Sequence, residues 1–129
     1  MYAPKEDVGK RRRGLLFQHS LVFLLAAEHR ADIKALLAFS LGEYLHGAST
    51  VRKAAAQVSI PIFVTSAMDP KEIATAKSIL DVSPSAEKTQ FVPQIGGVHG
   101  SSTLREDKNP HGAEENWLAV KKFLAKFSS

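Results

Sequence analysis

Three short runs of apolar residues along the chain have the length and composition of buried β-strands. The run from Ile33 to Phe39 is nearly continuous, as expected of a strand that is buried on both faces. The run from Ile60 to Thr65 is the clearest, and its Pro61 lies near the start, where a missing backbone N–H is tolerated. The third run extends from Lys88 to Val92. We predict one strand in each run.

The segments before, between and after these runs have helical patterns. Residues 20–30 are rich in helix formers and apolar almost all round, which predicts a buried helix over Leu21–His29. A short helix is expected over Val51–Val58. A longer helix is expected to run to about Leu80, with Asp69 at the N-cap, proline at the first position and glutamate at the third. The last helix is indicated by apolar residues at positions i, i+3, i+7 and i+10, namely Trp117, Val120, Leu124 and Phe127.

Helices and strands therefore alternate, which predicts the α/β class, with about three parallel strands joined by right-handed crossovers through helices. In such sheets, functional residues gather at the carboxyl ends of the strands. Three segments are expected there: residues 40–47, 66–69 and 93–102.

Two of these segments hold an acid and a histidine in consecutive order, as in the second half of a Ser…Asp…His sequence. The stretch Ile60–Asp69 (IPIFVTSAMD) resembles the strand and turn that present the acid of an α/β-hydrolase, and Gly97–Ser102 (GVHGSS) resembles the loop of the catalytic histidine. Phe39–Tyr44 (FSLGEY) is similar to the loop after the preceding strand. From about Leu21 to Phe127 the chain thus resembles the C-terminal half of an α/β-hydrolase of the dienelactone-hydrolase-like or serine-esterase branch, which implies a partial α/β-hydrolase fold.

The resemblance implies acyl transfer on a small ester or lactone. His99 would take a proton from the nucleophile and later give it to the leaving group, and Asp69 would orient the imidazole. Other interpretations stay open: Asp69 serves only as a helix N-cap, and His99 is an ordinary surface histidine. Glu43 and Tyr44 either line a pocket or are plain loop residues.

The nucleophile is missing from the place that the resemblance assigns to it. That place is near Leu16, within residues 14–18, where the sequence has no serine. Ser20 lies four residues further on, inside the predicted helix, where a cap or surface role is more economical. We therefore expect a serine hydrolase by family that is inactive as this isolated chain. The alternatives are a non-catalytic binding or interaction module built on half a hydrolase fold, and a small α/β domain whose likeness is accidental.

Charge is concentrated in the first residues of the chain. Residues 1–13 carry five basic and two acidic residues, and the other 116 are nearly neutral, so the net charge of +4 comes mostly from an N-terminal arm. A fold that grips nucleic acid has its positive charge on the folded face, so we expect no nucleic-acid partner. We assign residues 1–19 to this arm and 20–129 to the half-hydrolase domain. Codons for Arg11–His19, read one nucleotide later, can encode an intact nucleophile turn, so a shifted reading frame is one hypothesis for the arm.

Composition excludes several kinds of site. The chain has no cysteine, which removes disulfides, thiolate zinc sites, iron–sulfur clusters and cysteine nucleophiles. His46, His99 and His111 each precede a glycine, and no carboxylate stands at ligand spacing from them, so we expect no metal and no cofactor.

The start of the chain has the order of an export signal, with Lys10–Arg13 preceding an apolar stretch over Leu15–Ala27. Polar residues at 18–20 interrupt that stretch, no small-residue cleavage site follows, and its length is too short for a membrane span. We expect a cytoplasmic protein without a membrane partner, with export as the less favoured alternative.

The strand Ile33–Phe39 has an interior place in the fold that the chain resembles. Without a neighbour it would expose unpaired backbone groups beside apolar side chains. Leu15–Phe17 offers a substitute strand of only three residues. We therefore expect self-association through this strand edge.

Overall fold

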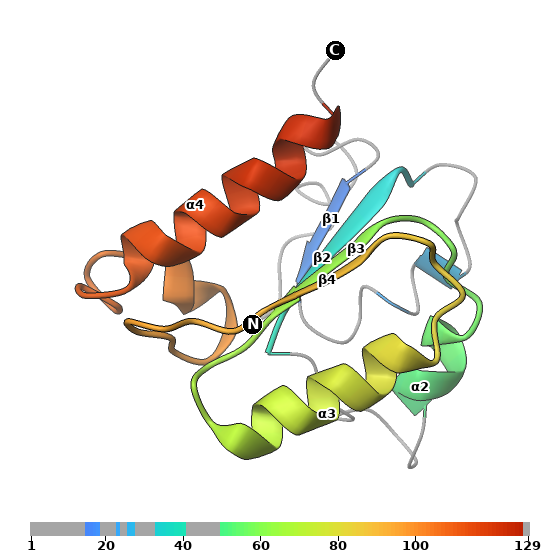
Figure 1. The fold of residues 1–129 in the computed structure, drawn as a ribbon, viewed down its shortest axis with the longest axis horizontal. Coiled ribbons are helices and arrows are strands. Elements are labelled where there is room, and N and C mark those ends of the chain that lie inside the picture. Colours follow the sequence, from blue (N-terminus) through green and yellow to red (C-terminus); the bar gives the residue numbers. More distant parts are fainter. Residues whose placement is uncertain (1–14, 19–22, 24–25, 28–32, 41–49, 128–129) are drawn as a thin grey trace.

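A computed structural model describes residues 15–18, 23, 26–27, 33–40 and 50–127 of the chain. These residues contain one parallel sheet of four strands, and its spatial order β1-β2-β3-β4 is also the order along the chain (Figure 1). The strands are β1 (Leu15–Gln18), β2 (Ala35–Phe39), β3 (Ile62–Thr65) and β4 (Lys88–Phe91). The predicted α/β class, with parallel strands alternating with helices, is confirmed.

Three α-helices and two short 3₁₀ helices lie wholly in the described part of the chain. They are α2 (Thr50–Ala55), α3 (Pro70–Asp81), η3 (Gly100–Leu104), α4 (Ala113–Leu124) and η4 (Ala125–Phe127). Phe23, Ala26 and Ala27 are helical, as predicted for 21–29, while the rest of that segment lies outside the described residues. The predicted helix over 51–58 ends at Ala55, and the segment 93–102, expected at a strand end, includes the start of the 3₁₀ helix η3.

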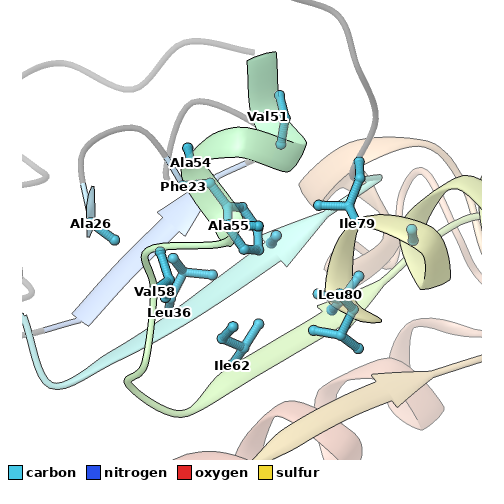
Figure 2. Close-up of a cluster of buried hydrophobic side chains, with 13 residues drawn as sticks. Phe23, Ala26, Leu36, Val51, Ala54, Ala55, Val58, Ile62, Ile79 and Leu80 are labelled. Carbon is cyan, nitrogen blue, oxygen red and sulfur yellow. The ribbon is translucent and has the colours of Figure 1, made fainter. Parts of the chain in front are cut away.

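The sheet is covered on both faces, with α2 and α3 on one side and α4 on the other (Figure 1). Side chains alternate across it: Leu36 and Ala38 of β2 join the cluster under α2 and α3, whereas Leu37 and Phe39 join the cluster under α4. Figure 2 shows the first cluster, in which side chains from both helices meet those of β2 and β3. Because β2 is buried throughout, its sequence is a continuous apolar run rather than an alternating one.

The cluster under α4 is built around aromatic rings. The ring centroids of Phe63 and Phe123 lie 5.5 Å apart, and those of Phe123 and Phe127 lie 5.4 Å apart. Val120 is also buried here, as predicted. Trp117, however, was predicted to face the core and is 41% exposed, and Asn116 is buried in its place. The helix is therefore rotated relative to the predicted apolar face.

The edge of β2 that we expected to be exposed is paired. β1 lies parallel to it in a register that matches Leu15 with Ala35 and Gln18 with Ala38. The apolar residues at the end of the predicted arm thus supply the backbone partners that β2 needs, and self-association through that edge loses its premise. Residues 15–18 of the segment assigned to the arm belong to the sheet.

Within the residues that the structure describes, no helix combines the length and apolar character needed to cross a membrane.

Candidate functional site

The carboxyl ends of β2, β3 and β4 lie along one edge of the sheet because the three strands are parallel. Ser40 follows β2 directly, Ser66–Asp69 connects β3 to α3, and His99 lies in the loop between β4 and η3. This is the edge at which the sequence predicted functional residues. His99 therefore lies at the same edge of the sheet as the start of α3, although β4 separates the two along the chain.

The imidazole of His99 contacts the carboxylate of Glu72. Its Nδ1 lies 2.8 Å from Oε2 of Glu72, which is the third residue of α3. The carboxylate is largely enclosed, with 16% of the side chain exposed, while 57% of the His99 side chain is exposed. The contact therefore joins a shielded acid to a histidine that solvent and small molecules can reach.

Two groups bind the Glu72 carboxylate directly. The backbone N–H of Ala67 donates to Oε1 at 2.9 Å, and Nδ1 of His99 lies 2.8 Å from Oε2. Burial raises the pKa of Glu72, but these hydrogen bonds and the charge of His99 outweigh burial and lower the pKa below its ordinary value. Glu72 is therefore ionised at neutral pH.

The ionised carboxylate fixes the tautomer of a neutral His99. A carboxylate only accepts hydrogen bonds, so Nδ1 of His99 must carry the hydrogen. The second ring nitrogen, Nε2, then carries no hydrogen in the neutral ring and can act as the base. The pair therefore has the chemistry of a general base, His99, whose ring is oriented by the Glu72 carboxylate.

Ser40 occupies an uncommon backbone conformation at this site. Its φ is 59°, in the left-handed region, and it is the one non-glycine residue with positive φ in the described chain. Its side chain is fully buried. The N–H of Gly100 donates to its Oγ at 2.6 Å, and its own N–H donates to the carbonyl oxygen of Thr65 at 2.8 Å. Ser40 thus connects the ends of β2 and β3 to the residue after His99.

Asp69 has the capping role that the sequence also allowed. It lies at the N-cap of α3, and its Oδ1 accepts from the N–H of Lys71 at 3.1 Å. Pro70 and Glu72 follow at the first and third helical positions, as predicted. A catalytic role for Asp69 stays a prediction, whereas the acid seen in contact with His99 is Glu72. Sequence reasoning placed Glu72 correctly but treated it only as part of the helix start.

The loop before His99 is held by a carboxylate from α4. Glu115 accepts from the N–H groups of Gln94 at 2.8 Å, Ile95 at 2.9 Å and Gly96 at 3.4 Å. Burial raises the pKa of Glu115, but the three backbone donors outweigh it and lower the pKa below its ordinary value. One side chain of α4 therefore fixes three consecutive residues of the loop.

Two asparagines bind a backbone carbonyl group of the same loop. The side-chain amides of Asn109 and Asn116 both donate to the carbonyl oxygen of Gly96, at 3.1 and 2.9 Å. Gly112 passes directly against Gly96: a Cβ on Gly112 would lie 2.6 Å from Cα of Gly96 and closer still to its carbonyl oxygen. A side chain is excluded at this crossing, so glycine is required there.

Several candidate residues lie outside the described chain: Ser20, Glu43, Tyr44 and His46. Leu16, at the place that the resemblance gives to the nucleophile, lies within β1. His111 is exposed near the start of α4. Among the residues for which the structure gives positions, no group of three histidine, aspartate or glutamate side chains is arranged to hold a metal ion.

Comparison of the chain with protein-family models, with curated proteins and with solved structures gave no match.

Proposed function

We propose that the chain carries the acid and histidine of an α/β-hydrolase-type serine hydrolase that acts on esters or lactones. The proposal depends on one observation, the 2.8 Å contact between Nδ1 of His99 and the carboxylate of Glu72. In catalytic triads the acid binds Nδ1, which leaves Nε2 to exchange protons with the nucleophile and the leaving group. The order of the sheet supports the proposal, since acid and histidine follow consecutive parallel strands.

The chemistry of this pair is general base and general acid catalysis. Nε2 of His99 removes the proton of a hydroxyl group while that oxygen attacks the carbonyl carbon of the ester. The imidazolium that forms is stabilised by the Glu72 carboxylate, which stays ionised. As the tetrahedral intermediate collapses, the C–O bond to the leaving group breaks and Nε2 returns the proton to the departing oxygen.

We propose further that the isolated chain has little esterase activity of its own. The resemblance assigns the nucleophile to position 16, where leucine has no hydroxyl group. The hydroxyl of Ser40, although near Glu72, is fully buried. These two observations favour a second candidate function, that of a non-catalytic binding module that retains the acid–histidine pair.

Hydrolysis of p-nitrophenyl acetate, with labelling by a fluorophosphonate, tests the proposal. We expect no labelled serine and slow hydrolysis that depends on His99. His99→Ala should lower this residual rate by about tenfold or more, because general base catalysis contributes on the order of 10²–10⁴-fold. His111→Ala, at an exposed histidine, is the matched control. If the wild type and the His99 variant have the same residual rate, the hydrolase proposal is overturned in favour of the binding module. A labelled serine with rapid turnover would show that the chain supplies its own nucleophile.

The identity of the acid has a separate test. Glu72→Gln keeps the shape of the side chain but removes the charge behind the imidazole, so it should lower the residual rate nearly as much as His99→Ala. Asp69→Asn keeps a good N-cap and should leave the rate unchanged. The reverse result would assign the role of the acid to Asp69.

A further inference from the structure

We propose that Ser40 is a positioning residue, whose buried hydroxyl links the loop of His99 to the carboxylate of Glu72 and holds the two in register. This inference rests on the proposed function only in treating His99 and Glu72 as the functional pair. Its evidence is the backbone conformation of Ser40, the hydrogen bond from Gly100 and the direction in which the hydroxyl must donate.

The backbone of Ser40 indicates that its hydroxyl matters. At a φ of 59° a side chain is sterically unfavourable, and glycine is the residue that takes this conformation at least cost. A serine is nevertheless present and completely buried. Non-glycine residues in this region persist where surrounding contacts hold them, and they concentrate at functional sites. The hydroxyl group is the feature that glycine would lack.

The hydrogen bonds of Ser40 have a defined direction. A hydroxyl has one hydrogen to donate and two electron pairs to accept with. The N–H of Gly100 donates to Oγ at 2.6 Å, which uses one electron pair and leaves the hydrogen free to donate. The hydroxyl of Ser40 also helps to lower the pKa of the Glu72 carboxyl, and an ionised carboxylate can only accept a hydrogen bond. We infer that the hydroxyl hydrogen points towards Glu72, so that Ser40 connects the Gly100 amide with the carboxylate.

The position of Ser40 makes this link rigid. Its backbone N–H donates to the carbonyl oxygen of Thr65, the last residue of β3, at 2.8 Å. The loop that leads into α3, and so to Glu72, begins at the same place, and Gly100 directly follows His99. One residue thus contacts the segments next to both members of the pair. The complete burial of the hydroxyl, and its use by both partners, favours this role over that of a nucleophile.

The experiment compares Ser40→Ala and Ser40→Gly with Ser101→Ala, an exposed serine in the same turn. Two quantities are measured by NMR: the pKa of the Glu72 carboxyl, by ¹³C titration, and hydrogen exchange of the Gly100 amide. Both Ser40 variants should raise the pKa of Glu72 towards its ordinary value. Both should also speed exchange at Gly100 by about tenfold, the change expected from loss of one ordinary hydrogen bond. The Ser101 variant should change neither.

Ser40→Gly keeps the test valid if Ser40→Ala folds poorly, because glycine relieves the backbone while removing the same hydroxyl. An unchanged pKa of Glu72 in a folded Ser40→Gly variant would overturn the proposal. Fluorophosphonate labelling of Ser40 would also overturn it, by showing that the hydroxyl is a nucleophile. Neither NMR measurement needs ester hydrolysis, so failure of this inference is distinguishable from failure of the proposed function.

Discussion

Asp69 and Glu72 stand at the N-cap and the third position of the same helix, and their carboxylates bind different partners. Asp69 accepts from the backbone N–H of Lys71, whereas Glu72 accepts from the imidazole of His99. Capping and contact with the histidine are therefore separate tasks at one helix start. The two acids can be tested independently.

Replacement of Asp69 should affect the helix and leave the histidine pair intact. Asp69→Ala removes the N-cap acceptor and should lower the free energy of unfolding by about 1 kcal/mol. Asp69→Asn should be nearly neutral, because asparagine caps helices as well as aspartate does. Urea denaturation of the three proteins measures the difference. A large loss of stability in Asp69→Asn would indicate a role for the charge that capping does not explain.

The pH dependence of stability should report the ionisation of Glu72. Its pKa is lowered in the folded chain, since hydrogen bonds and the charge of His99 outweigh burial, so folding favours the ionised form. The resulting stabilisation is fully present above the unfolded pKa, about 4.3, and is lost as the pH falls through the lower folded value. Carboxyl groups titrate between about pH 5 and 3. When the pH is lowered through this range, Glu72→Gln should therefore lose less stability than the wild type.

Urea midpoints measured across that range compare the two proteins directly. Asp81→Asn, at an exposed ion pair with Lys77, is a suitable control. Parallel stability curves for the wild type and Glu72→Gln would contradict the lowered pKa.

Removal of the Glu115 carboxylate should loosen the loop before His99. Glu115→Ala deletes the acceptor shared by three backbone N–H groups, and we expect a loss of about 1–2 kcal/mol, since water replaces part of the lost hydrogen bonding. Hydrogen exchange at Gln94 and Ile95 should become faster. Glu114→Ala changes the exposed neighbouring residue and should leave both properties unaltered. If hydrogen exchange at Gln94 and Ile95 is equally fast in the two variants, Glu115 does not hold this loop.

A side chain at Gly112 should be poorly tolerated. In Gly112→Ala the new methyl group meets the backbone of Gly96, which cannot turn aside as a side chain can. We expect a loss of about 1–3 kcal/mol, the usual range for overpacking, measured by thermal or urea unfolding. His111→Ala, one residue earlier and exposed, is the control. Wild-type stability in Gly112→Ala would mean that the two backbones separate easily.

The sequence predicted the central strands and the start of α3 well, because local signals specify them. The apolar run before Ser40 and the Asp-Pro-x-Glu start of α3 need no information from distant residues. β1 is different: its three apolar residues are too few to predict a strand, and pairing with β2 stabilises it. Such pairing is a tertiary effect that no window of sequence contains.

The face of α4 and the contact between Glu72 and His99 were missed for a related reason. Asn116 takes a buried position because its amide donates to Gly96, so a polar residue displaces Trp117 from the predicted apolar face. Likewise, the choice between Asp69 and Glu72 depends on where the first turn of α3 points relative to His99. Hydrophobic periodicity carries no information on either contact.

The hydrogen bond between Gly100 and Ser40 has a consequence for the folding pathway. It joins residues 60 positions apart, more than twice the 27 that separate His99 from Glu72. Closing a longer loop costs more entropy, so this bond is expected to form only after β2, β3 and β4 have paired and brought their ends together. In a partly folded chain, this bond would not yet hold the loop of His99 in place. Its formation is then a late folding event, and protection of the Gly100 amide reports it.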